Sequence, residues 1–225
     1  MSFSYYEVYT SCQRAFSGMN FPHGADEDAA YAITWLELYN LKGIDLFCSF
    51  IEEFNNQIDF KIDISNIKKI DLKNKSSLMT GPGLIDYIVS KFILNNIKEY
   101  NLINCYDPIF LLPMLSKYSK KNIYTKVLHG QEIFCLISNG QVSLNKKFLI
   151  NKKNTNIKIV LSDDTYDFET LDINFELNDA EKKLSIGLNP NQKSWDKVTE
   201  LAFQSFVPES EESRSKGAGG GDAND

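Results

Sequence analysis

Arginine is nearly absent from this 225-residue sequence, which holds two arginines, Arg14 and Arg214, against twenty-two lysines. A protein that binds nucleic acid needs clustered cations, whereas the net charge here is −6, so no nucleic-acid partner is expected. Because lysine is the ordinary cation of this chain, an arginine that persists indicates a need for a planar, bidentate guanidinium. Arg14 and Arg214 are therefore candidate ligand-binding residues.

The sequence also lacks the segments that export or membrane insertion would require. No basic region followed by an apolar run opens the chain, and no stretch reaches the roughly eighteen apolar residues that span a bilayer. The four cysteines are scattered without a C-x-x-C pair, which is typical of reduced thiols, with a disulfide or metal cluster as the alternative. We therefore expect a cytoplasmic protein with no membrane partner.

No short motif in the sequence assigns a reaction. The nucleophile elbow, the P-loop, the dinucleotide fingerprint and the spacing of zinc ligands are all missing. The glycine-rich end follows a predicted helix, whereas a Rossmann or Walker loop precedes one. Whether the protein is an enzyme, and which cofactor it would use, is therefore open at this stage.

The periodic segments predict an α+β fold in which helices come first and strands second. Apolar residues recur at helical spacing up to about residue 118, and they alternate as in strands from about 123 to 188. A last helix is expected over 191–206. We therefore expect one domain, residues 1–206, with an N-terminal helical block, an antiparallel sheet and a C-terminal helix, followed by a glycine-rich tail at 207–225.

The helical block begins with three expected helices. Ser4 and Glu7 form the pattern of a capping box, and Gly18 is a natural end to the helix that they start. Acidic residues then fill the first turn of a second helix from about Ala25, where carboxylates offset the positive end of the helix dipole. A third helix is expected around Phe47 to Phe54.

Turn residues divide the rest of the chain. Gly81-Pro82-Gly83 predicts a break, with a buried helix from Leu84 to Ile97 after it. Asn139-Gly140 predicts a tight hairpin turn between two strands. One or two strands are expected between Ile58 and Leu72. Later strands are expected over three segments: Ile157–Leu161, Leu171–Leu177 and Lys183–Leu188.

Alanine is missing between Thr34 and Asp179, and it returns with glycine in two islands, each beside one arginine. The first island, Ala15 to Ala32, adjoins Arg14. The second, Gly217 to Ala223, belongs to a polar tail that would be disordered on composition alone. The alternative interpretation is an anion site, in which Arg214 clamps a carboxylate or phosphate and glycine amides cradle an oxygen.

Three elements of the chain resemble a known family. The tail residues concerned are Val207, Pro208, Ser210, Ser213, Arg214, Gly217, Ala218 and Gly219. The first island contributes Gly18, Pro22, Gly24, Ala25 and Glu27, and a third element is Gly81-Pro82 followed by Asp86. The tail is similar to the terminal signature V-P-x-S-x-x-S-R-x-x-G-A-G of a family of uncharacterised, largely proteobacterial proteins. The first island departs from that family at His23, where tryptophan is expected. The resemblance implies an ordered tail and no assigned activity.

Glu27 is the carboxylate that we single out as a candidate for acid–base catalysis, because it lies in the first island near Arg14. A salt bridge between Glu27 and one of the arginines is the plainer alternative. His23 with the neighbouring acids could be written as a weak metal site, but acids that cap a helix explain the pattern better. No metal ligand is therefore predicted.

Two functions fit these observations. In the first, the helical island, the Gly81-Pro82 turn and the tail enclose a small anionic metabolite, a carboxylate or a phosphate. The expected ligand-binding residues are Arg14, Ser213, Arg214, Gly217 and Gly219. In the second, the chain is a non-catalytic subunit whose tail docks into a partner enzyme or into a second copy of itself, as a homo-oligomer. We favour the first function, because both arginines need an explanation.

Overall fold

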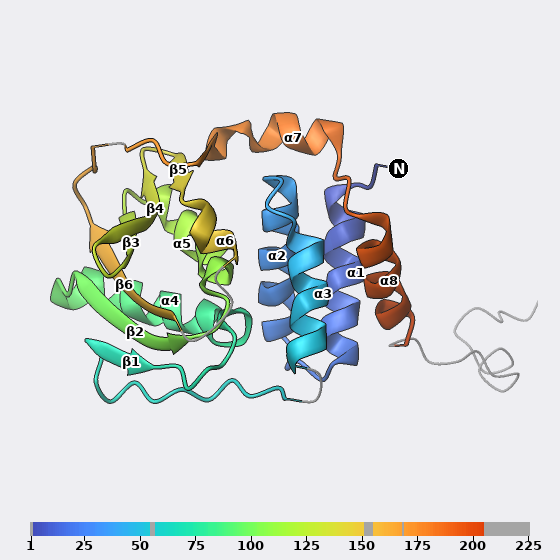
Figure 1. Cartoon of the computed structure of the whole chain (residues 1–225), viewed down its shortest axis with the longest axis horizontal. Helices are drawn as coiled ribbons and strands as arrows, with labels where there is room; N and C mark the ends of the chain where they lie inside the picture. Colours follow the sequence, from blue (N-terminus) through green and yellow to red (C-terminus); the bar gives the residue numbers. More distant parts are fainter. Residues whose placement is uncertain (1, 55–56, 151–154, 168, 205–225) are drawn as a thin grey trace, which may run out of the picture.

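The computed structural model describes residues 2–54, 57–150, 155–167 and 169–204, which form a helical part and a sheet part lying side by side (Figure 1). The helical part holds α1 (Tyr5–Gly18), α2 (Ala25–Leu38), α3 (Gly43–Phe54) and α8 (Gln192–Gln204). The predicted tail lies outside the described residues. Helices combined with a mostly antiparallel sheet confirm the α+β class.

The three N-terminal helices begin and end close to where the sequence predicts. The Ser4 hydroxyl accepts the amide of Glu7 at 3.1 Å, and the Glu7 carboxylate accepts the amide of Ser4 at 2.8 Å. The predicted capping box is therefore confirmed, and α1 ends at Gly18 as expected. The helices pack through buried aromatic rings, among them Phe16 and Phe47, whose centroids lie 4.1 Å apart.

Within the described ranges, the sheet has seven strands in the order β1-β2-β6-β3-β4-β5-β7. Their bounds are β1 (Lys69–Asp71), β2 (Glu99–Cys105), β3 (Tyr124–His129), β4 (Glu132–Ser138), β5 (Gln141–Leu144), β6 (Thr155–Ser162) and β7 (Ile173–Glu176). β1 and β2 are parallel, and all other neighbours are antiparallel. Asn139 and Gly140 join β4 to β5 with φ values of 51° and 75°. A type I′ turn requires positive φ at both positions, so the predicted hairpin is confirmed.

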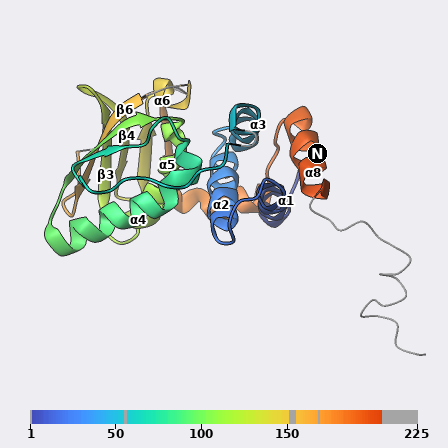
Figure 2. The ribbon, with the colours of Figure 1, turned by 90° about the horizontal axis from the view of Figure 1, so that it is seen from below.

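Further helices pack on the sheet and connect it to the helical part. Their bounds are α4 (Ser77–Asn95), η1 (Pro108–Phe110), α5 (Leu111–Ser119), α6 (Lys146–Ile150), η2 (Leu177–Asp179) and α7 (Ala180–Ile186). α4 lies along one face of the sheet, and α2 lies between the sheet part and the other helices of the bundle (Figure 2). α7 bridges the two parts on its way from β7 to α8 (Figure 1). One side of α2 therefore meets α4, α5 and α7.

Helices and strands are less cleanly separated along the chain than the sequence suggests. β2 forms before residue 118, inside the segment expected to be helical, and it pairs with β1 at one edge of the sheet. Its buried and exposed residues alternate imperfectly, so periodicity alone does not reveal this strand. Between Ile58 and Leu72, where every residue is described, the one strand is the three-residue β1.

Gly81, Pro82 and Gly83 do not interrupt the helix, so the predicted break at this position is wrong. α4 runs through them, and Pro82 lies in its second turn, where it removes one helical hydrogen bond. The cap at Ser76 starts the helix earlier than expected, since its hydroxyl accepts the amide of Leu78 at 3.2 Å. Gly81 lets α5 approach closely, because a Cβ there would stand 2.8 Å from the side chain of Leu111.

The strand predicted over Lys183–Leu188 is also wrong, because this segment forms most of α7. Its Ala-Glu-Lys-Lys-Leu start favours a helix more strongly than the alternating apolar residues favour a strand. Gly187 ends the helix with a φ of 82°. Leu188 then pairs with Phe3 through two backbone hydrogen bonds of 2.8 and 2.9 Å, which ties α7 to the start of the chain.

Candidate functional site

One face of α2 carries aromatic side chains at helical spacing. Tyr31, Trp35 and Tyr39 stand four residues apart, so they project from the same side of the helix. Trp35 and Tyr39 are buried, with ring centroids 4.5 Å apart. Tyr39 also stacks on Phe175 of β7 at 4.6 Å, and its hydroxyl donates to the carbonyl of Leu177 at 2.9 Å. This face therefore meets the sheet part at the junction between the two parts.

A pocket of about 330 Å³, which we call the seam pocket, lies between this face of α2, the end of α5, and α7. What we call the aromatic wall consists of Tyr5, Tyr31, Trp35 and Tyr39, together with the aliphatic Leu38. The polar wall consists of Ser116, Lys117 and Lys120. The apolar cover consists of Leu177, Ala180 and Leu184. The volume falls at the lower end of the range for small-molecule sites, roughly 300–1,000 Å³.

Two lysines place positive charge on the polar wall. The Nζ of Lys117 lies 4.1 Å from the centroid of the Tyr31 ring and 3.8 Å from a carboxylate oxygen of Asp28. Both partners of this ion pair are nearly half exposed, at 41% and 46%, so water screens it and it contributes little to stability. Lys120 is exposed one turn further along. Both ammonium groups are therefore available to a ligand at little cost.

Ser116 contributes a buried hydroxyl to the same wall. Its side chain is 3% exposed, and its Oγ has no hydrogen-bond partner among the described residues. An unpaired buried hydroxyl costs about 1–3 kcal/mol. The other such hydroxyl belongs to Thr125 of β3, which does not line the seam pocket. Since Ser116 precedes Lys120 by four residues, the two lie on the same side of the helical turn.

The phenols of the aromatic wall are neutral at physiological pH. Burial raises the pKa of Tyr5 to about 12, and it also raises the pKa of Tyr31. The pKa of Tyr39 is raised first by burial and then by the charge of Asp179. The Nζ of Lys183, on α7, lies 5.6 Å from the Tyr39 ring. An anionic ligand would therefore meet uncharged phenols, not phenolates, on this wall.

A larger pocket of about 450 Å³, the α2–α4 pocket, lies at the start of α2. Its lining consists of Ala25, Asp28, Phe60, Ile62, Ile64, Met79, Thr80, Pro82, Gly83, Leu84 and Tyr87. The first island and the Gly81-Pro82 element, which the sequence analysis places in one site, both contribute to this lining. Among these residues Asp28 is the single charged one, so the pocket offers no cation to an anionic ligand. The Asp28–Lys117 ion pair joins a residue of each pocket.

Two of the site residues predicted from the sequence, Arg14 and Glu27, belong to the described part of the chain. Arg14 and Glu27 are exposed and line neither pocket. The buried acid of the first island is Asp26, whose carboxylate accepts the Ser17 hydroxyl at 2.8 Å and the amides of Gly24 and Glu27 at 2.9 Å. Asp26 therefore braces α1 against the start of α2. Four further candidates lie outside the described residues, and their roles stay predictions: Ser213, Arg214, Gly217 and Gly219.

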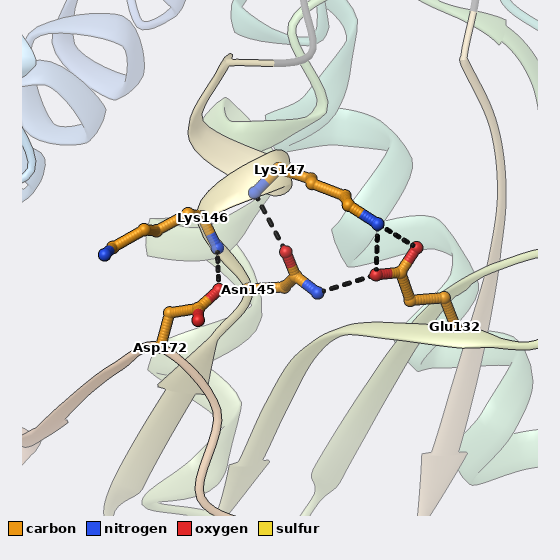
Figure 3. Close-up of polar contacts among 5 residues, drawn as sticks. All are labelled: Glu132, Asn145, Lys146, Lys147 and Asp172. Carbon is orange, nitrogen blue, oxygen red and sulfur yellow. Dashed lines mark hydrogen bonds and ion pairs between the residues drawn. The ribbon is translucent and has the colours of Figure 1, made fainter.

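A polar cluster beside α6 shows a contrasting arrangement, in which the side chains of Glu132, Asn145, Lys147 and Asp172 all bond to other members of the cluster (Figure 3). The Nζ of Lys147 lies 2.8 and 3.1 Å from the two carboxylate oxygens of Glu132, and Asn145 donates to one of them at 2.9 Å. Lys147 thereby holds the pKa of the Glu132 carboxyl below its usual value. Asp172 accepts the amide of Lys146 at 2.8 Å. These mutual bonds anchor α6, so the cluster is structural.

The four cysteines are buried and line neither pocket. Burial raises the pKa of the Cys12, Cys105 and Cys135 thiols, which makes them poor nucleophiles. Within the described ranges, no group of three or more His, Cys, Asp or Glu side chains could hold a metal ion. In the same ranges, no helix combines the length and the apolar character needed to cross a membrane.

Comparison with known proteins adds a partial family match and a fold. Residues 3–80 match a family described as a protein of unknown function, DUF3726. The structure is similar to malate dehydrogenase from Entamoeba histolytica, with a TM-score of 0.59 and 7% identity over 93% of this chain and 99% of that chain. It is also similar to sulfolactate dehydrogenase from Methanocaldococcus jannaschii, with a TM-score of 0.56 and 9% identity over 91% of this chain and 97% of that chain. At such identities the likeness shows the fold alone. Among curated proteins, none matches the sequence.

Sequence reasoning missed the seam pocket, although part of its signal is visible. The spacing of Tyr31, Trp35 and Tyr39 marks an aromatic face on α2, which could have been noted beside the aliphatic stripe of the same helix. Lys117 and Lys120 give no such signal, because only the packing of α5 on α2 brings them to that face. The missing partner of the Ser116 hydroxyl is likewise a property of the folded chain.

Proposed function

We propose that this protein binds a small organic anion in the seam pocket. The observation that carries the proposal is the end of α5, which places two lysines and an unpaired, buried hydroxyl on one wall of an aromatic pocket. A carboxylate that accepts a hydrogen bond from Lys117 or Lys120 gains about 0.5–1 kcal/mol from each, because both side chains are exposed. A second bond from Ser116 would also remove the cost of leaving its hydroxyl unpaired.

The fold supports a small-molecule site at this place, by analogy. Small-molecule sites occur preferentially at junctions between structural units, and the seam pocket lies at such a junction. The two dehydrogenases of similar fold are named for malate and sulfolactate, which are small organic anions. Since one fold hosts many functions, this likeness raises the prior for an anionic ligand and does not assign a reaction.

Isothermal titration calorimetry of the full chain against malate, phenylacetate and inorganic phosphate tests the proposal. We expect at least one of these anions to bind with a dissociation constant below about 1 mM. Exchanging both lysines for glutamine, as Lys117→Gln with Lys120→Gln, should weaken that binding at least about tenfold. Lys193→Gln on α8 is the matched control, because it removes an exposed charge that does not line the pocket. Equal affinity in the double variant and the control would contradict the proposal.

A contribution from Arg14 and the tail is a separate proposal. If Ser213 and Arg214 hold the anion, a chain that ends at Gln204 should lose affinity, and Arg14→Lys should do the same in the full chain. Lysine keeps the charge of Arg14 but lacks its bidentate geometry. Unchanged affinity in both variants would confine the site to the seam pocket and remove the predicted role of the arginines.

A further inference from the structure

The charges of the seam pocket come from the end of α5, whereas the residues that η2 and α7 contribute to its lining are apolar. Lys117 and Lys120 both stand at the end of α5. The cover, from η2 and α7, consists of Leu177, Ala180 and Leu184. Lys183 of α7 lies over the Tyr39 ring, and it does not line the pocket. This arrangement suits a ligand with one anionic end and one apolar end.

The pocket also selects the shape of the apolar end. Trp35 and Tyr39 both line the pocket, with their rings tilted by 42° to each other, and Tyr31 and Tyr5 also belong to the aromatic wall. Aromatic rings attract one another in offset or edge-to-face geometry beyond the effect of area alone. A planar ring would therefore bind roughly tenfold more tightly than a puckered aliphatic ring of the same size.

The hydroxyl of Ser116 fixes where the anionic end of the ligand lies. Because Ser116 and Lys120 share one side of the last turn of α5, a carboxylate there receives a hydroxyl bond and an ammonium bond together. The volume of about 330 Å³ leaves room for one ring system beside that carboxylate. A second carboxylate at the far end would meet the apolar side chains of Leu177 and Leu184, which offer it no hydrogen bond.

We infer that the seam pocket takes an aromatic monocarboxylate, with its carboxylate at Ser116 and Lys120 and its ring against Trp35. This inference rests on the proposed function, that the seam pocket binds an anion, and it adds the chemical class of the ligand. Aliphatic dicarboxylates, such as the malate named for the structural neighbour, are then poor ligands.

Fluorescence titration of the full chain tests the ligand class. The chain holds two tryptophans, so Trp195→Phe leaves Trp35 as the reporter of its own pocket. The probes are phenylacetate, cyclohexylacetate and malate; the first two differ in the planarity of the ring and not in charge. We expect phenylacetate to change the Trp35 emission and to bind about tenfold more tightly than cyclohexylacetate, with malate weaker still.

Two hydroxyl variants separate a ligand contact from a structural role. Ser116→Ala should lower the affinity for phenylacetate about five- to tenfold, while the melting temperature stays the same or rises, because an unpaired hydroxyl is removed. Thr125→Val is the matched control: it removes the other unpaired buried hydroxyl and should leave phenylacetate affinity unchanged. A purely structural Ser116 would behave as Thr125 does.

The outcomes distinguish this inference from the proposed function. Equal binding of phenylacetate and cyclohexylacetate, or tighter binding of malate, overturns the aromatic class while the anion site stands. Ser116→Ala with unchanged affinity overturns the placement of the carboxylate. Binding by none of the three probes overturns the proposed function together with this inference.

Discussion

The two pockets on α2 differ in chemistry more than in size. The α2–α4 pocket is the larger, at about 450 Å³, yet its lining offers one carboxylate and otherwise apolar or neutral groups. The seam pocket, at about 330 Å³, gathers aromatic rings, two lysines and a buried hydroxyl without a partner among the described residues. Between these two, volume alone would favour the α2–α4 pocket. The unpaired hydroxyl and the two lysines instead favour the seam pocket as the binding site.

The largest expected effect comes from the aromatic wall. Trp35→Ala should lower the free energy of unfolding by about 3–5 kcal/mol, because the side chain is 6% exposed and its removal leaves a cavity. Tyr87→Ala in the α2–α4 pocket should cost less than about 2 kcal/mol, since that side chain is only partly buried. Urea denaturation measures both values. Similar losses of unfolding free energy in the two variants would contradict the distinction between the two pockets.

High pH should lower the stability of the folded protein through Tyr5 of the aromatic wall. Burial raises the pKa of Tyr5 to about 12 from a usual value of 10. The folded protein holds this phenolic proton more tightly than the unfolded chain does, so the stabilisation is complete below pH 10 and is lost as the pH rises toward 12. Partial exposure limits the loss to no more than about 2 kcal/mol. Denaturation at pH 9, 10 and 11 should show a shallower decline for Tyr5→Phe; an identical decline would refute this assignment.

Two glycines of α4 allow a finer test of how tightly each side is packed. A Cβ at Gly83, which lines the α2–α4 pocket, meets no atom within 4 Å, so Gly83→Ala should raise stability by about 0.5–1 kcal/mol. A Cβ at Gly81 would press on Leu111 at 2.8 Å, so Gly81→Ala should give no gain or lose up to about 1 kcal/mol. Thermal unfolding distinguishes the two, and the Gly83 variant should bind anions as the unchanged chain does.

The smallest effect should come from the residue that connects the two pockets. Asp28→Asn removes the carboxylate that pairs with Lys117 at 3.8 Å, which leaves that ammonium to the ligand. Because the pair is exposed and worth about 1 kcal/mol at most, we expect anion affinity to rise two- to fivefold. Calorimetry at low salt measures the change. A fall in affinity would indicate that Asp28 orients Lys117, so that the two pockets act together.

The elements that sequence reasoning found are those whose signals are local. The capping box at Ser4 and the turn at Asn139-Gly140 depend on a few neighbouring residues, and both are confirmed. β2 escaped prediction because its side chains do not alternate cleanly. The apolar residues of Lys183–Leu188 alternate as in a strand, but the first residues of α7 have high helix propensity, and the segment folds as a helix.

The candidate site could be predicted only in part, because it joins segments far apart in the chain. An anionic ligand was expected from the two arginines, yet Arg14 is exposed on α1 and Arg214 lies outside the described residues. The cations of the seam pocket are ordinary lysines, which composition does not single out. Their significance depends on the packing of α5 against α2, and sequence spacing does not encode that contact.

The crystal structure of the full chain in complex with phenylacetate tests the central claim most directly. We predict the ligand in the seam pocket, with its ring against Trp35 and a carboxylate oxygen within hydrogen-bond distance of the Ser116 hydroxyl and the Lys120 ammonium. A ligand in the α2–α4 pocket, with the seam pocket empty, would contradict the claim that complementary groups, and not volume, mark the functional site.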